Sequence, residues 1–372
     1  MLQQLRPSRL TPPPSPVAEA VAKAPLPETA TKEFNPVISN HPALAPIDWS
    51  VIGQSAPQLP ETPAGELPLA DAVVITWAEA EWAALQHIFC GSGQSMPYSN
   101  RNTSTWPGWQ QYTEDLSKVS GWDYWGNFRL VLLGSKRVLL FKSNTHLDYP
   151  GGAYLTQLIN RLINIVKPGL ILSIGTAGGA MPSNHIGTVN AVHAGTMYAA
   201  GQPETQWKTY SNAWQAGWEI ISQPAFQQLL VPIPTTTADI DAIVSQFNTF
   251  YKTAYAAADL NIDNLALGDK VPLLQNMTGA GTSLLTASSF VVGDSAGNYQ
   301  NFACIEMDDA VIAQACEAAA TSFGFIRNIS DPVQNAALPA KVQADWGSAI
   351  YDAYGFYTSV NGALAAWGVL SS

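Results

Sequence analysis

Acidic residues follow predicted strands at two places in this chain, where their carboxyl groups could accept or donate protons. In residues 74–82 (VITWAEAEW), a short apolar run predicts a strand that leads into a helix carrying Glu79 and Glu81. Ligands of α/β folds lie at the carboxyl ends of such strands, and a carboxylate placed there can deprotonate water. The alternative interpretation is a solvated glutamate in the first turn of the helix, where the helix dipole favours a negative charge.

The second acidic position is Asp331, at the end of residues 326–331 (IRNISD), which predict another strand. A carboxylic acid at this point could protonate a leaving group and so lower the barrier to its departure. Alternatively, Asp331 caps the segment that follows it, with Pro332 in the next position. Both roles are open to the same side chain.

Two further segments have residue types that suit the binding of a polar ligand. Residues 304–308 (CIEMD) contain Glu306 and Asp308, and a carboxylate can accept hydrogen bonds from two hydroxyl groups at once. Residues 173–179 (SIGTAGG) follow a predicted buried strand, and their small side chains would let a ligand approach the backbone closely. The spacing of these glycines fits neither a dinucleotide-binding turn nor a P-loop. A tight turn between a strand and a helix is the alternative.

These segments, together with residues 288–291 (SSFV), occur in an order that resembles the nucleoside phosphorylase/nucleosidase superfamily over roughly residues 70–335. The resemblance is closest to the methylthioadenosine/S-adenosylhomocysteine nucleosidase branch. It implies that Glu81 activates water, with Glu79 as the rival, and that Asp331 protonates N7 of a leaving purine. Arg327 would orient the ribose-binding carboxylate. The implied substrate-binding residues are Thr176, Ala177 and Gly178 near the ribose and the nucleophile, Phe290 and Val291 at the base, Glu306, Met307 and Asp308 at the ribose hydroxyls, and Arg327 and Ser330.

The chain departs from the superfamily pattern at two positions. Phosphorylases of one branch have a phosphate-binding arginine just before the small-residue turn, where this chain has Ser173. The resemblance therefore implies hydrolysis of the N-glycosidic bond of a purine, adenosine-like nucleoside or nucleotide, which releases free base and ribose. Asp308 is one methylene shorter than the usual glutamate, so either the sugar lies closer, Glu306 shares the role, or hydroxyl recognition is altered. A phosphorylase and a storage or binding protein of the same fold are the alternatives.

The elements that must position these residues alternate between strands and helices, with strands predicted at 72–75, 128–133, 137–141, 170–174, 187–193, 284–288 and 324–329. Helices are predicted at 79–89, 153–166 and 308–321, with another inside 203–270. This alternation predicts an α/β fold, a three-layer sandwich around a mixed, mainly parallel sheet. Two aromatic-rich segments, 96–127 and 203–270, interrupt the alternation as insertions. Their aromatic side chains either pack on the core or cover a base-binding pocket.

The proline content separates an N-terminal arm from this domain. Residues 1–66 hold 13 of the 26 prolines and little periodic apolar pattern, which predicts an extended or disordered arm. The catalytic domain is then expected at 67–372. We expect deletion of residues 1–60 to leave the thermal transition close to that of the full chain.

The charge and the cysteine content limit the classes of partner and cofactor that the chain is expected to bind. The net charge is −11 without a basic run, which argues against nucleic acid, and no apolar run approaches the roughly 18 residues of a membrane span. Cys90, Cys304 and Cys316 lack metal-ligand spacing, so no metal or other cofactor is expected, and reduced thiols favour a cytoplasmic location. The expected partners are a small-molecule nucleoside and further copies of the chain in a homo-oligomer, a dimer or larger.

Overall fold

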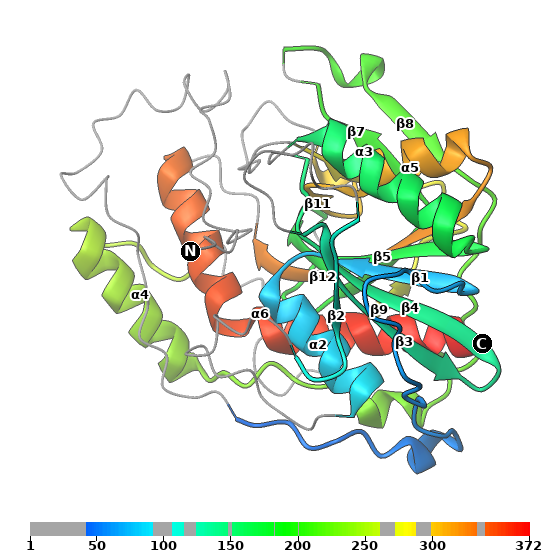
Figure 1. The fold of residues 1–372 in the computed structure, drawn as a ribbon. Coiled ribbons are helices and arrows are strands. Elements are labelled where there is room, and N and C mark those ends of the chain that lie inside the picture. Colours follow the sequence, from blue (N-terminus) through cyan, green and yellow to red (C-terminus); the bar gives the residue numbers. More distant parts are fainter. Residues whose placement is uncertain are drawn as a thin grey trace.

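The central sheet has twelve strands within the part of the chain that the computed structural model describes, which is residues 42–91, 106–114, 124–147, 151–181, 183–199, 201–260, 272–287, 299–332 and 339–372. Its main path runs β2-β3-β4-β1-β5-β11-β10-β7-β8, while β12 pairs with β5 and β6, and β6 with β9 (Figure 1). The strands are β1 (Ala72–Thr76), β2 (Gln110–Tyr112), β3 (Gly126–Leu133), β4 (Lys136–Ser143), β5 (Leu170–Gly179), β6 (Val189–Val192), β7 (Ala194–Met197), β8 (Lys208–Ser211), β9 (Leu274–Asn276), β10 (Leu284–Thr286), β11 (Ile305–Glu306) and β12 (Ser322–Pro332).

The sheet mixes parallel and antiparallel pairs, because β5 is antiparallel to β11 and antiparallel pairs also lie toward both ends of the path. β5 is parallel to β1 and to β12, and β1 is parallel to β4. β3 is antiparallel to β2 and β4, and β7 is antiparallel to β8. This large mixed sheet, parallel in part, confirms the predicted α/β class.

Helices cover both faces of the sheet. They are α2 (Glu79–Cys90), α3 (Gly152–Arg161), α4 (Thr237–Tyr251), α5 (Asp309–Ala318) and α6 (Ala340–Ser371), and α3 continues as a π-helical turn at Leu162–Val166. Alternate residues of a strand point to opposite faces. Accordingly, Val74 and Leu172 lie in one apolar core with α2 and α6, whereas Val73 and Ile171 lie in another with α3 and α5. The three predicted layers are therefore present.

Every strand and helix predicted from the sequence overlaps an observed element, but the sequence patterns did not predict the helix α6 or the short strands β2, β7, β8, β9 and β11. This helix of 32 residues packs against α2, β5 and β12. Buried residues lie on all its sides, including Trp346, Tyr354, Leu364 and Trp367. A helix that is apolar all round lacks the periodic stripe from which a surface helix is predicted, and this explains the omission.

Residues 42–66 of the proline-rich arm are held against the domain. The Trp49 ring lies 4.2 Å from the Trp367 ring of α6, centroid to centroid. Gln58 forms a backbone bridge with Leu132 of β3, and the Leu130 backbone N–H donates to the Thr62 hydroxyl at 3.2 Å. Trp49 and Thr62 are both buried. These contacts contradict the expectation that residues up to 60 could be removed without effect.

We expect deletion of residues 1–60 to lower the free energy of unfolding by about 3 kcal/mol or more, because loss of a buried tryptophan typically costs that much. Urea denaturation would measure it, with deletion of residues 1–41, which keeps Trp49, as the matched control. Equal midpoints for the 1–60 deletion and the full chain would show that the Trp49–Trp367 contact contributes nothing.

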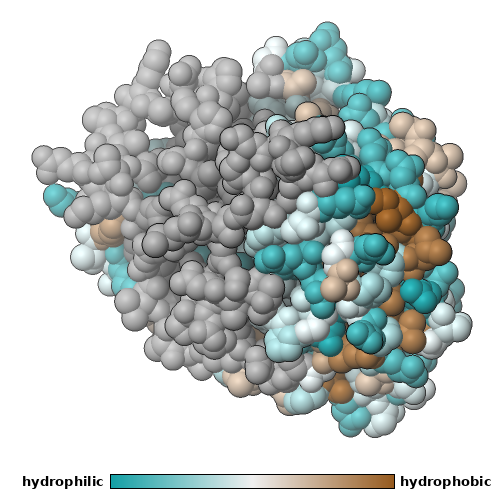
Figure 2. Space-filling view, in the orientation of Figure 1, coloured by the Kyte–Doolittle hydropathy of each residue, from teal (hydrophilic) through white to brown (hydrophobic). Residues whose placement is uncertain are grey.

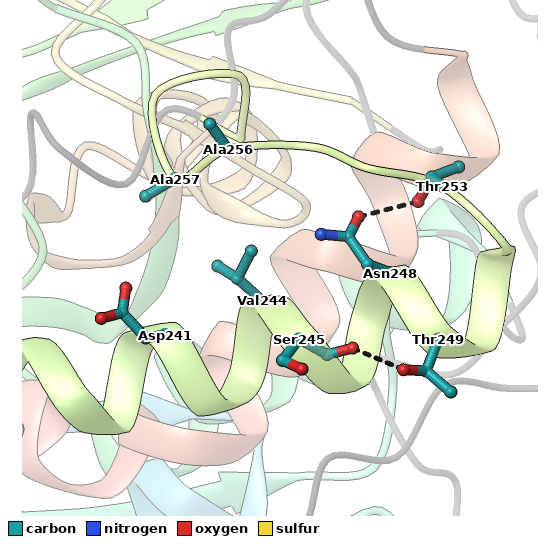
Figure 3. Close-up of a pocket in the computed structure, with 8 residues that line it drawn as sticks. All are labelled: Asp241, Val244, Ser245, Asn248, Thr249, Thr253, Ala256 and Ala257. Carbon is teal, nitrogen blue, oxygen red and sulfur yellow. Dashed lines mark hydrogen bonds between the residues drawn. The ribbon is translucent and has the colours of Figure 1, made fainter.

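The described aromatic residues of the two insertions are mostly part of the cores. Trp109, Tyr112 and Trp125 are buried, and the indole N–H of Trp109 donates to Gln86 Oε1 of α2 at 2.8 Å. Packing thus accounts for these side chains. On the face shown in Figure 2, hydrophobic residues gather at the right-hand side among hydrophilic ones. Along α4 a cavity of about 550 Å³ opens to solvent, lined by Asp241, Val244, Ser245, Asn248, Thr249, Thr253, Ala256 and Ala257 (Figure 3). None of the predicted site residues lines it.

Candidate active site

The predicted site segments meet at the carboxyl end of β5. The β5–β12 register pairs Gly175 with Arg327 and, after an irregularity between Ile329 and Asp331, pairs Gly178 with Asp331. Gly178 also pairs with Ile305 of β11, which precedes Glu306. Parallel strands end at the same edge of a sheet, so β1, β5 and β12 deliver their polar residues to one place.

Glu81 is the third residue of α2 and is buried at the junction of β1 and β5. Its Oε2 accepts hydrogen bonds from the Thr76 hydroxyl at 2.6 Å and from the backbone N–H groups of Trp77 and Ala78 at 3.0 and 2.8 Å. Its Oε1 accepts from the backbone N–H and the hydroxyl of Thr176, both at 2.7 Å. A carboxylate at this helix position commonly bonds back to the cap, and here it also ties α2 to β5.

The electrostatic surroundings of Glu81 favour its ionised form. Burial alone would raise its pKa, but the Arg327 charge and the donors from Thr176, Thr76 and Trp77 outweigh burial and hold the pKa below its ordinary value of 4.5. The lack of a side chain at Gly175 allows Arg327 and Glu81 to lie close to each other. A β-carbon at Gly175 would lie 2.5 Å from Arg327 Nη1 and 2.8 Å from Glu81 Oε1.

Arg327 is the centre of a buried ion-pair network. Its Nε donates to Asp309 Oδ2 at 2.7 Å, and its Nη2 donates to Asp309 Oδ1 and, at 2.8 Å, to the Ser173 hydroxyl. The Ser173 hydroxyl in turn donates to Asp309 Oδ1 at 2.6 Å. We expected Arg327 to orient Asp308, but its partner is the next residue. Asp308 is the N-cap of α5 and has the non-helical φ of −137°, so its side chain leaves in another direction.

Glu306 binds the start of α5. Its carboxylate accepts from the Thr286 hydroxyl, from the backbone N–H of Asp308 at 2.6 Å and from that of Asp309 at 3.0 Å. Arg327 Nη2 lies 3.3 Å from Oε2. Burial and the neighbouring Asp309 raise the pKa of Glu306 to about 8. Since these groups occupy both oxygens, Glu306 serves as a structural acceptor in this arrangement.

Asp308 is held by the segment after β4. Its Oδ2 lies 2.9 Å from His146 Nδ1, and its Oδ1 accepts from the backbone N–H of Leu147 at 2.9 Å. An isolated histidine carries no sequence signal for this contact, so sequence reasoning missed His146. Met307, between the two carboxylates, is partly exposed.

Asp331 differs from the acidic residues above because one of its two carboxyl oxygens has no hydrogen-bond partner among the described residues. Oδ1 accepts from the Ser330 hydroxyl at 2.6 Å, whereas Oδ2 is buried without a hydrogen-bond partner among the described residues. Burial raises the pKa of Asp331 to about 6, although the Ser330 bond opposes this. Ser330 Oγ also lies 3.4 Å from the Ala177 carbonyl oxygen, which links the pair to β5.

The predicted residues Phe290 and Val291 lie outside the described residues. The structure brings the remaining predicted positions together around the end of β5, and it adds Ser173, Asp309 and His146. Within the described ranges, no group of three or more His, Cys, Asp and Glu side chains could hold a metal ion. No helix in the same ranges is long and apolar enough to cross a membrane.

No family model matches the chain, and no curated protein matches it either. The chain is similar to solved nucleosidases. One is the 5'-methylthioadenosine/S-adenosylhomocysteine nucleosidase of Neisseria meningitidis, at a TM-score of 0.45 and 14% identity over 81% of this chain and 99% of that chain. Another is the S-adenosylhomocysteine nucleosidase of Streptococcus pyogenes, at a TM-score of 0.45 and 16% identity over 82% of this chain and 98% of that chain. The futalosine hydrolase of Helicobacter pylori is similar at a TM-score of 0.42 and 12% identity over 81% of this chain and 97% of that chain.

Proposed function

We propose that the chain hydrolyses the N-glycosidic bond of a purine nucleoside with an adenosine-like base, releasing the free base and ribose. The observation that carries the proposal is Asp331 Oδ2, a buried oxygen that has no hydrogen-bond partner among the described residues, on a carboxyl group whose pKa is about 6. Such a group can hold a proton near neutral pH and donate it. A purine leaves readily only when its developing negative charge is neutralised, and donation to N7 achieves this.

Glu81 is the proposed base for the attacking water. Its lowered pKa keeps it ionised, which a proton acceptor requires. The Glu81 carboxylate accepts five hydrogen bonds, and a carboxylate has roughly four lone-pair sites. Water can therefore bind to Glu81 only if one of these donors rotates away and breaks its hydrogen bond. The hydroxyl of Thr176 is suited to this exchange, because it can rotate and its residue is partly exposed.

Water is favoured over phosphate by the charges around the site. The charge of Arg327 is already engaged, because its guanidinium forms an ion pair with Asp309 and lies close enough to the Glu81 carboxylate to lower the pKa of Glu81. A phosphate dianion brought into this field would be repelled, whereas neutral water would not. Ser173, at the position of the phosphorylase arginine, is engaged with Asp309 and Arg327. A chromatographic screen for free base from a nucleoside and nucleotide panel, with and without phosphate, tests the proposal.

The proposal predicts a pH profile with a defined basic limb. Asp331 must be protonated and Glu81 ionised, so kcat/KM should be highest between pH 4.5 and about 6. Above the Asp331 pKa of about 6, the protonated fraction and kcat/KM should fall about tenfold per pH unit. Initial rates of adenine release from adenosine between pH 4.5 and 8.5 measure this. A kcat/KM that rises between pH 6 and 8 would assign the proton donor to another group.

A further inference from the structure

Within the part of the chain that the structure describes, Asp308 keeps one acceptor site on each oxygen. A carboxylate oxygen has two lone pairs. One lone pair on Oδ1 is used by the Leu147 N–H and one on Oδ2 by His146, which leaves one on each oxygen. Two acceptors side by side suit two hydroxyl groups on adjacent carbons. Glu306 cannot share this task in the present arrangement, because its oxygens bind the start of α5.

His146 is itself fixed by its neighbours. The Trp77 indole N–H donates to the Thr145 carbonyl oxygen at 2.8 Å, and the Trp77 and His146 rings lie 6.0 Å apart, centroid to centroid. The Thr145 backbone N–H donates to the Ser143 hydroxyl at 3.0 Å, which holds the turn after β4. His146 is buried. The ring therefore meets Asp308 from a rigid support, and the Nδ1 contact implies that Nδ1 carries the proton when Asp308 is ionised.

We infer that His146 is a positioning residue that aligns the Asp308 carboxylate with the two vicinal hydroxyls of a ribose, so that the site selects ribonucleosides over 2'-deoxyribonucleosides. The inference rests on the proposed function, which it extends to the sugar. The His146 contact also explains how the short Asp308 side chain is held in one orientation. A sugar with only one of the two hydroxyl groups should bind more weakly, because one acceptor site of the buried carboxylate is then left without a hydrogen bond.

Two variants separate positioning from packing. His146→Asn keeps a donor at the Nδ1 position but loses the ring, whereas His146→Phe keeps a ring but loses the donor. We expect His146→Phe to raise KM for adenosine by roughly tenfold or more, with kcat changed less, and to lower the adenosine to 2'-deoxyadenosine ratio of kcat/KM by roughly tenfold. His146→Asn should stay within about threefold of the unmodified chain in both quantities.

The outcomes are distinguishable. A normal selectivity ratio in His146→Phe, or equal losses in both variants, overturns the positioning role. If His146→Phe does not melt cooperatively, His146→Leu replaces it, with the same expectation. If the unmodified chain releases base from neither nucleoside, the proposed function fails. If it releases base and only the selectivity result is absent, the inference about His146 fails alone.

Discussion

Replacing Asp331 with asparagine should lower base release by about a hundredfold or more while the fold is retained, since general acids commonly contribute that much. The amide keeps the size of the side chain and can still accept the Ser330 hydroxyl bond. It cannot give up a proton to N7 of the base. The measurement is kcat/KM for adenine release from adenosine at pH 6, where the proposed acid is half protonated.

Asp241→Asn provides the control, because Asp241 is an exposed aspartate of α4 beside the remote cavity. It should behave like the unmodified chain. A thermal melt of both variants shows whether the fold persists. Turnover by Asp331→Asn within a few-fold of normal would remove Asp331 from the role of acid.

Changing Glu81 to glutamine should abolish most of the hydrolytic step, again by about a hundredfold or more, because the amide cannot accept the proton of water. Substrate binding should change little. With the unmodified chain in ¹⁸O-labelled water and phosphate-free buffer, mass spectrometry should find one labelled oxygen in the ribose. Glutamine also presents an NH₂ group to donors that now face an oxygen, so the melt of this variant must accompany its kinetics.

Glu79→Gln is the matched control for Glu81→Gln. Glu79 lies two residues earlier in the same helix turn and is partly exposed. Its variant should keep near-normal turnover, whereas the reverse result would assign the base to Glu79. Acceleration by phosphate, with ribose 1-phosphate as product and no label in the sugar, would replace hydrolysis by phosphorolysis.

The strand and helix segments that carry Glu81 and Asp331 could be predicted because their signals are local. An apolar β-branched run before a helix start identifies β1 and α2, and residues 326–331 end β12 as expected. The resemblance to the superfamily implied that these segments share one site, and their meeting at β5 agrees with the rule that parallel strands end at one edge.

The contacts that complete the site could not be predicted, because they join distant segments. His146 and Asp308 are 162 positions apart in the chain. The choice of Asp309 over Asp308 by Arg327 depends on the backbone angles at the cap of α5, which two adjacent aspartates do not reveal. The packing of residues 42–66 depends on α6, and this helix could not be predicted because its apolar residues lie on all sides.

The pairing of β5 with both β1 and β12 also determines the point during folding at which the candidate site can form. This strand receives β1 on one side and β12, about 150 residues later in the chain, on the other. Arg327 and Asp331 arrive together on β12. A nascent chain that has not yet added that strand contains the Glu81 carboxylate but lacks both Arg327 and Asp331, the proposed proton donor. Assembly of the proposed catalytic groups therefore has to wait for β12, and it requires closure of a long loop, which slows folding of parallel sheets.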